Sequence, residues 1–158
     1  MNPFDSLRNY ETSVYTLRQQ YPSIRSATLV VAPQGQRVSV LRGQLLFDQG
    51  YRISIRERIS WESGRGIIES YSYELWHHTK KIAWYDPQPH PNDPTLASTH
   101  PHHKHVPPDI KHHRVPAPGL SFTQPNLPLL IREIEALIAQ RSTTQTDSTE
   151  THEEPENQ

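Results

Sequence analysis

The stretch YRISIRERISW, residues 51–61, alternates between apolar and polar side chains along its whole length. This period of two is typical of a β-strand with one buried face and one solvent-exposed face. The apolar side chains are expected to face the core together with Glu57, and Arg52, Arg56 and Arg58 are expected to face the other way. The stretch therefore predicts a strand in a sheet whose second face is basic.

Further strands are predicted on both sides of this stretch, over residues 26–32, 37–48, 67–77 and 80–85. Short turns such as Asp48-Gln49-Gly50 join them, and parallel neighbours would need long crossovers. The sequence therefore predicts an antiparallel meander of about five to six strands. Strands 26–32 and 80–85 are candidate sheet edges. Gly43 is expected at a β-bulge, because the apolar parity shifts across it.

A helix is predicted at each end of this meander, so the fold class is α+β. Apolar residues recur at three- and four-residue steps over residues 4–21 and again over 126–140. Asn2 and Asn126 are the expected caps of the two helices, and Pro22 should end the first.

Ten prolines interrupt residues 86–125, which also hold most of the histidines. Proline breaks helices and central strands, so this segment is expected to be a long Pro/His-rich loop that lies over the sheet. Residues 1–140 are then a single domain. Residues 141–158 have no aliphatic or aromatic side chain and are expected to form a disordered acidic tail.

Charge and composition narrow the class of protein. The tail holds one arginine and five acidic residues, a net of −4, so residues 1–140 carry +3 of the whole chain's −1. A mildly basic body is compatible with an acidic partner or RNA. The chain has no cysteine, which excludes disulfides and thiolate metal sites. No apolar run is long enough to span a membrane and no secretory signal is evident, so a cytoplasmic location without membrane contact is expected.

The chemistry is concentrated in THPHHKH, residues 99–105. Histidine exchanges a proton near neutral pH and is also the commonest metal ligand. One interpretation is a metal-free site for RNA cleavage, in which histidines act as acid and base and a cation stabilises the phosphorane. The same segment can instead hold a divalent metal such as zinc, with His100, His102 and His105 as ligands. A third interpretation is a histidine-rich loop with incidental metal affinity.

Residues around this segment are candidates to assist. Asp86 ends the last predicted strand and could orient a histidine through its second ring nitrogen. Arg52, Arg56 and Arg58 could bind phosphates, although a solvated sheet face paired with Glu69 or Glu74 is an equally simple interpretation. Tyr85 and His90 are further candidate substrate contacts, whereas aromatic residues in strands more often serve packing.

These residues resemble a known family. Tyr85-Asp86, Pro89-His90-Pro91 and Pro101-His102-His103-Lys104-His105, followed by a proline-rich spacer and an apolar helix, are similar to the TumE-like toxins of prokaryotic toxin–antitoxin systems. Trp84 departs from the family pattern, which tends to have arginine there. The resemblance implies a toxin that targets RNA and is neutralised by a co-encoded antitoxin.

The leading hypothesis is therefore the toxin of a type II toxin–antitoxin pair, acting as a metal-independent ribonuclease without a cofactor. His102 and His105 are assigned as acid and base, with His103 beside them, Lys104 as the cation and Asp86 as the orienting carboxylate. The alternative is a non-catalytic protein whose histidine-rich loop binds a metal or a partner. The expected partners are an antitoxin and RNA, and a homodimer is also expected.

Overall fold

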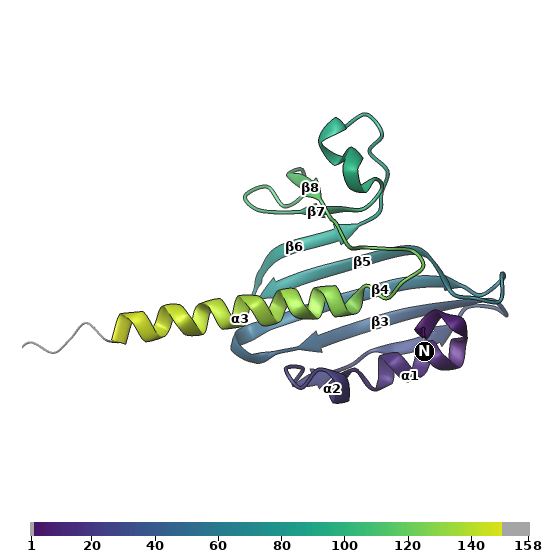
Figure 1. The fold of residues 1–158 in the computed structure, drawn as a ribbon, viewed down its shortest axis with the longest axis horizontal. Helices are drawn as coiled ribbons and strands as arrows, with labels where there is room; N and C mark the ends of the chain where they lie inside the picture. Colours follow the sequence, from purple (N-terminus) through teal and green to yellow (C-terminus); the bar gives the residue numbers. More distant parts are fainter. Residues whose placement is uncertain (1, 150–158) are drawn as a thin grey trace, which may run out of the picture.

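A computed structural model describes residues 2–149 of the chain. These residues form one antiparallel sheet of eight strands with helices on one of its faces (Figure 1). The predicted α+β class is confirmed, and the sheet has more strands than the five to six expected. Within the described range, no helix is both long enough and apolar enough to cross a membrane.

The long strands form the predicted meander. The strands are β1 (Ser26–Ala27), β2 (Val30–Pro33), β3 (Val38–Leu46), β4 (Tyr51–Ser60), β5 (Ile67–His77), β6 (Lys80–Asp86), β7 (His103–His105) and β8 (Arg114–Pro116). The order across the sheet is β1-β3-β4-β5-β6-β7-β8, and β2 also pairs with β3. Each neighbour in this order is antiparallel, as the short turns require.

Strand β4 has the predicted two faces. Tyr51, Ile53, Ile55 and Ile59 are buried in the core, and the intervening positions are half-buried or exposed. The buried face packs against the helices, which leaves the opposite face of the sheet open. We call this second face, with no helix on it in residues 2–149, the open face.

Glu57 is the polar exception on the buried face. Its carboxylate accepts hydrogen bonds of 2.6 Å from the hydroxyls of Tyr10 and Tyr73, and Asn126 in turn donates to the Tyr73 hydroxyl at 3.1 Å. Burial raises the pKa of Glu57, while the two hydroxyls that donate to it lower the pKa and partly compensate. The network ties the first helix and the start of the last helix to the middle of the sheet.

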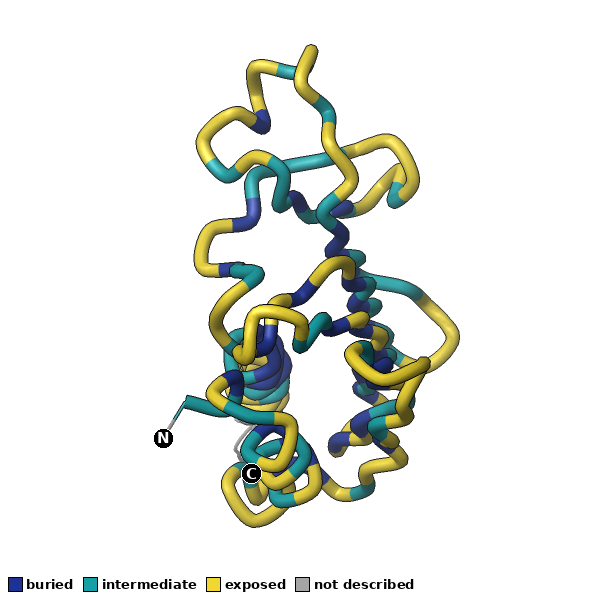
Figure 2. The backbone as a smooth tube through the Cα atoms, turned by 90° about the vertical axis from the view of Figure 1, so that its right-hand side faces the viewer, coloured by how far each residue is buried: buried dark blue, intermediate teal, exposed yellow. Residues whose placement is uncertain are grey.

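The helices form one layer over the buried face. Figure 1 shows the last helix, α3 (Leu127–Thr149), crossing β3, β4 and β5, and Figure 2 shows the buried residues gathered on this helix and on the strands. The first predicted helix is divided into a turn, η1 (Pro3–Asp5), and two helices, α1 (Leu7–Tyr15) and α2 (Leu17–Gln20).

The helix caps differ in detail from those predicted. Asn2 caps η1, and Ser6 caps α1 by accepting a hydrogen bond from the Asn9 amide. Asn126 precedes α3, but its side chain bonds to Ser121 and Tyr73 instead of capping the helix.

The C-terminal helix continues past its expected end at residue 140 and includes residues 141–149 of the expected tail. No proline or glycine occurs there to stop it, and the hydroxyls of Ser142, Thr143 and Thr144 bond to carbonyls four residues earlier. The rest of the expected tail, residues 150–158, lies outside the described residues.

The edge of the sheet beyond β6 differs most from expectation. The predicted loop contributes a helical turn, η3 (Pro94–Thr99), and the strands β7 and β8, which extend the sheet in its own plane. Strand β6 is therefore not an edge, because His103–His105 pairs with it. The later part of the loop does return to the core, where Ala117 and Leu120 are buried.

The opposite edge is as expected, since β1 and β2 both pair with β3 and with no further strand in the described residues. Gly43 does not mark a bulge, because the register between β3 and β4 is continuous. It instead allows a close crossing of the chain: a Cβ atom at Gly43 would lie 2.5 Å from the carbonyl oxygen of Thr28, and its φ is +141°.

Candidate functional site

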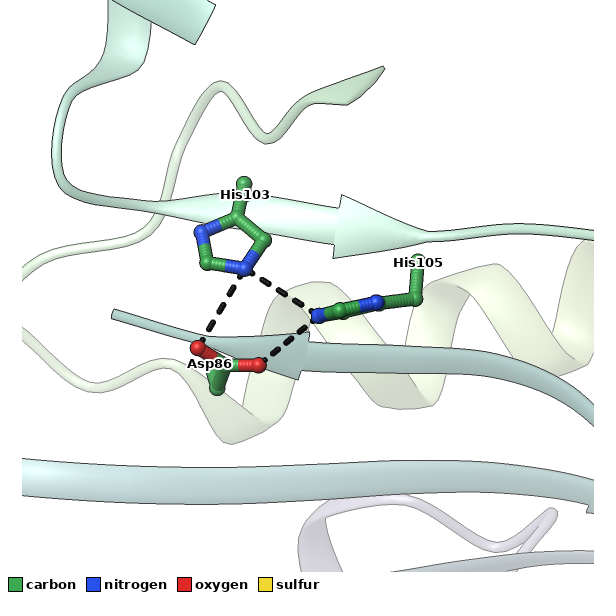
Figure 3. A group of neighbouring side chains, drawn as sticks. All are labelled: Asp86, His103 and His105. Carbon is green, nitrogen blue, oxygen red and sulfur yellow. Dashed lines mark hydrogen bonds and ion pairs between the residues drawn. The ribbon is translucent and has the colours of Figure 1, made fainter. Parts of the chain in front are cut away.

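The end of β6 and the whole of β7 bring a carboxylate and two imidazoles together. Asp86 lies directly opposite His103 in the sheet, and His105 is two residues further along the same face of β7. His103 Nε2 lies 3.2 Å from Asp86 Oδ1, and His105 Nε2 lies 2.9 Å from Asp86 Oδ2. The two Nε2 atoms are 3.1 Å apart. Figure 3 shows the three side chains pointing at one another. We call them the Asp–His–His cluster.

The backbone of the loop fixes the orientation of both rings. His103 Nδ1 lies 3.1 Å from the carbonyl oxygen of Pro101, and His105 Nδ1 lies 3.1 Å from that of Lys111. The indole of Trp84 stacks on His105 with ring centroids 4.3 Å apart. The cluster is therefore enclosed: His103 is 1% exposed and His105 is 3% exposed.

Strand alternation sends the neighbouring residues of the motif to the opposite side. Lys104 lies between the two cluster histidines, and its Nζ donates to Glu133 of α3 at 2.5 Å. The Tyr85 hydroxyl donates to the same carboxylate. His102 also lies on this helix side, where its Nδ1 is 2.6 Å from the Tyr71 hydroxyl. The five predicted catalytic residues are thus divided between two faces of the sheet.

His90 and Arg114 border the cluster. The ring of His90 meets that of His103 edge to face at 4.9 Å. Burial, followed by the charge of Arg114, lowers the pKa of His90. Arg114 lies opposite His105 in the sheet, and its buried Nε has no hydrogen-bond partner in the described part of the chain. An imidazole and a guanidinium therefore stand beside the enclosed cluster.

The arginines of β4 lie on the open face, as predicted, and two of the three are engaged there. Arg52 donates to the carbonyl of His78 at 2.6 Å, and Arg58 pairs with Glu69 at 2.9 Å. Arg56 lies opposite Arg42 of β3, and neither has a partner among residues 2–149. Like charges directly opposite each other destabilise a sheet unless an anion bridges them.

The unpaired arginines and the cluster share the open face. Arg56 lies opposite Ser72, and the hydroxyl of Ser72 accepts a hydrogen bond of 3.0 Å from the Trp84 indole that covers His105. A shallow hollow between β3 and β5 is lined by Arg42, Arg56, Ser72 and Glu74, and the carboxylate of Glu74 pairs with Lys81 and not with an arginine. The open face therefore runs from a basic surface to the Asp–His–His cluster.

The structure unites some predicted site residues and separates others. It brings together Asp86, His103 and His105, with His90 at their border. It leaves His100 exposed and outside the cluster, so the ligand set His100, His102 and His105 is not assembled. Sequence reasoning missed Arg42, Arg114 and Glu133. One signal could have found part of this arrangement. If the histidine segment is taken as a strand, the alternation of side chains places Lys104 on the opposite face from His103 and His105.

Comparison with known proteins gives the same family as the motif. The family model described as Toxin TumE matches residues 14–138, which include the cluster, both arginines and most of the sheet. The chain belongs to the TumE toxin family. No curated protein and no solved structure matches it. A toxin role is therefore shown by family membership, and the TumE match extends beyond the short histidine motif.

The cluster is also the group of residues in the described chain best able to hold a metal ion. One ligand atom from each of Asp86, His103 and His105 lies within 4.8 Å of the other two, and all three residues are buried. The same three groups could instead share protons. The choice between these two states depends on the hydrogen bonds around the rings.

Proposed function

We propose that this TumE protein is the toxin of a type II toxin–antitoxin pair and that it cleaves RNA on the open face of its sheet. The observation that carries the proposal is the shared face: two unpaired arginines, Arg42 and Arg56, lie on the same side of the sheet as the Asp–His–His cluster. Guanidinium groups bind phosphates through planar, permanently charged donors. RNA bound along the arginines would pass close to the cluster.

The proposed reaction is attack of a 2′-hydroxyl oxygen on the adjacent phosphorus. The P–O5′ bond breaks, which leaves a 2′,3′-cyclic phosphate on one fragment, and the leaving 5′-oxygen takes a proton from water to become a 5′-hydroxyl on the other. The reaction requires a proton acceptor and a positive charge near the phosphorane. His90 supplies a half-buried imidazole outside the cluster, placed to accept the proton. The cluster holds the positive charge, either as protons or as a metal ion, and Arg114 adds a second one. Lys104 and His102 are not part of this proposal, because they contact Glu133 and Tyr71 on the helix side.

An antitoxin is the expected protein partner of a TumE toxin, and we propose that it covers the open face. A partner with acidic side chains would pair with Arg42 and Arg56 and exclude RNA at the same time. An added strand, either from the antitoxin or from a second copy of the chain, could also contact the edge formed by β2. It would bond there mainly to carbonyl groups, because the Val31 amide already donates to the Tyr15 hydroxyl at 2.9 Å and Pro33 has no N–H.

Expression in bacterial cells tests the function. Induction of the wild-type chain should stop growth and degrade RNA, and co-expression of the neighbouring antitoxin gene should restore growth. His105→Ala should be harmless, whereas His112→Ala, which changes an exposed histidine outside the cluster, should remain toxic. Full toxicity of His105→Ala at equal protein level would refute the proposed centre.

The near-complete burial of His103 and His105 favours one alternative, a non-catalytic protein in which the histidine-rich loop binds a metal or a partner. The two functions differ in whether RNA must reach the cluster. The Asp86 side chain is 11% exposed, and its strand, β6, lies next to β5, between β7 and the strands that carry the arginines. If expression of the wild-type chain stops growth while cellular RNA stays intact, the alternative is supported.

A further inference from the structure

We propose that Asp86, His103 and His105 bind one divalent transition-metal ion, for which zinc is the best match. The inference deepens the proposed function by naming the cofactor of the same site, and the ion's catalytic role rests on that function. The geometry of the three ligands is independent of that function.

The proton positions leave an excess of acceptors. A backbone carbonyl can only accept a hydrogen bond, so the contacts of His103 and His105 with carbonyl oxygens require a proton on each Nδ1. A neutral imidazole has one proton, so both Nε2 atoms are then bare lone pairs. They face each other at 3.1 Å and face the oxygens of Asp86 at 3.2 and 2.9 Å. Four acceptor atoms converge, and a cation must lie among them.

Protons are the weaker candidates for that cation. A single added proton would pair one imidazolium with Asp86, but it can bridge only two of the four atoms, so the other Nε2 lone pair would still face an acceptor at 3.1–3.2 Å. A second proton would place two imidazolium charges side by side against one carboxylate, on residues that are 1% and 3% exposed. Burying charge without full pairing is costly. A metal ion instead bonds to all three ligands while both imidazoles stay neutral, and those bonds offset the cost of burial.

The distances match a metal site. Zinc bonds of about 2.0–2.1 Å in tetrahedral geometry place ligand atoms about 3.3 Å apart. The observed separations of 2.9, 3.1 and 3.2 Å are slightly shorter, so an ion needs an outward movement of only a few tenths of an ångström. Donation of the second ring N–H to a backbone carbonyl is also the usual arrangement for a metal-bound histidine. Both cluster histidines have it.

The ligand types indicate the class of ion. Two imidazoles and one carboxylate suit zinc or another first-row transition metal, whereas calcium and magnesium prefer oxygen ligands. Three protein ligands leave the fourth tetrahedral position free, as in catalytic zinc sites. Such an ion would supply the positive charge that the proposed cleavage of RNA needs, next to the imidazole of His90.

Metal binding to the untagged full chain tests the inference. The protein is stripped with a chelator, dialysed against zinc and analysed for bound metal, and its affinity is measured by competition with a chromogenic chelator. The wild type should hold one zinc. His103→Ala and Asp86→Asn should each weaken binding at least tenfold. The double variant His112→Ala/His113→Ala, which removes two exposed histidines, should bind as tightly as the wild type.

Two controls keep the result interpretable. Asp86→Asn keeps an oxygen for the Gln88 amide, which Asp86 Oδ1 accepts at 2.8 Å, so its circular dichroism without metal should match the wild type. Cobalt should quench the fluorescence of Trp84, which stacks on His105, and this part of the signal should be lost in Trp84→Phe. These controls separate ligand loss from misfolding.

Several outcomes would overturn the inference: no zinc at micromolar concentration, equal affinity in Asp86→Asn, or loss of binding in the His112→Ala/His113→Ala control. Zinc binding without any RNA cleavage would leave the metal site standing and refute the proposed function. Undiminished cleavage by fully metal-free protein would support the function and refute the catalytic ion.

Discussion

Removal of the two unpaired arginines gives a quantitative test of the RNA-binding face. In Arg42→Gln/Arg56→Gln, two cations are lost from opposite positions on neighbouring strands, and no ion pair of the described residues is broken. The side chains are largely exposed, so the fold should be unaffected. The change therefore isolates phosphate contacts from stability.

The magnitude follows from counterion release. Each phosphate contact with single-stranded RNA contributes about 0.7 to the slope of log K against log salt concentration, so two contacts contribute about 1.4. Between 50 and 200 mM salt, this difference corresponds to about a sevenfold change in relative affinity. The variant should thus bind RNA more weakly at low salt and respond less to added salt.

The assay is fluorescence anisotropy with a labelled single-stranded RNA, performed in the His105→Ala background to prevent cleavage. Arg65→Gln is the matched control, because Arg65 is exposed and already paired with Asp5 at 2.8 Å. Its slope should equal that of the parent. An unchanged slope in the double variant, or an equal fall in the control, would refute the assignment of the open face to RNA.

Three further predictions test other parts of the structure. Because burial raises the pKa of Glu57 above its ordinary value of 4.5, its contribution to stability is complete below that pH and is lost as the pH rises through the raised pKa. Glu57→Gln should remove this loss of stability at higher pH, so the difference between the urea midpoints at pH 4.5 and pH 8 should be smaller in the variant than in the wild type. His102→Ala removes the partner of the Tyr71 hydroxyl and should lower the free energy of unfolding by about 1–3 kcal/mol in urea titrations, yet leave RNA cleavage intact. Loss of cleavage by a folded His102→Ala protein would argue against the assignment of His102 to the face of the sheet opposite the reaction centre. Gly43→Ala places a Cβ atom against the Thr28 carbonyl at a positive φ and should lower the free energy of unfolding by about 1–3 kcal/mol. An unchanged melting temperature would contradict this prediction.

Much of the fold could be predicted because long strands have a strong periodic signal. The alternation in residues 51–61 predicted both the strand and its two faces, and Glu57 lies on the buried face as expected. The β-strands 103–105 and 114–116 could not be predicted in this way, since three residues are too few for a period. Prolines around them favoured a loop, but β7 itself contains no proline, and Pro116 lies in β8, the last strand of the sheet, where a proline is tolerated.

The candidate site was only partly predictable for a related reason. The motif predicted which residues carry the chemistry, but not which face of the sheet each occupies. In β7, successive side chains point to opposite faces of the sheet. His103 and His105 therefore contact Asp86 on one face, and Lys104 contacts Glu133 on the other. The pairing of β7 with β6 is a contact between distant segments, which a single sequence does not reveal.

The most direct test of the account is RNA cleavage by purified protein under single-turnover conditions. A labelled RNA is incubated with the wild type, His105→Ala and the exposed control His112→Ala. We predict cleavage by the wild type and the control, and a rate lower by at least about 100-fold in His105→Ala, because the cluster holds the charge that stabilises the phosphorane. Equal rates in all three proteins would contradict the central claim that the Asp–His–His cluster is the reaction centre.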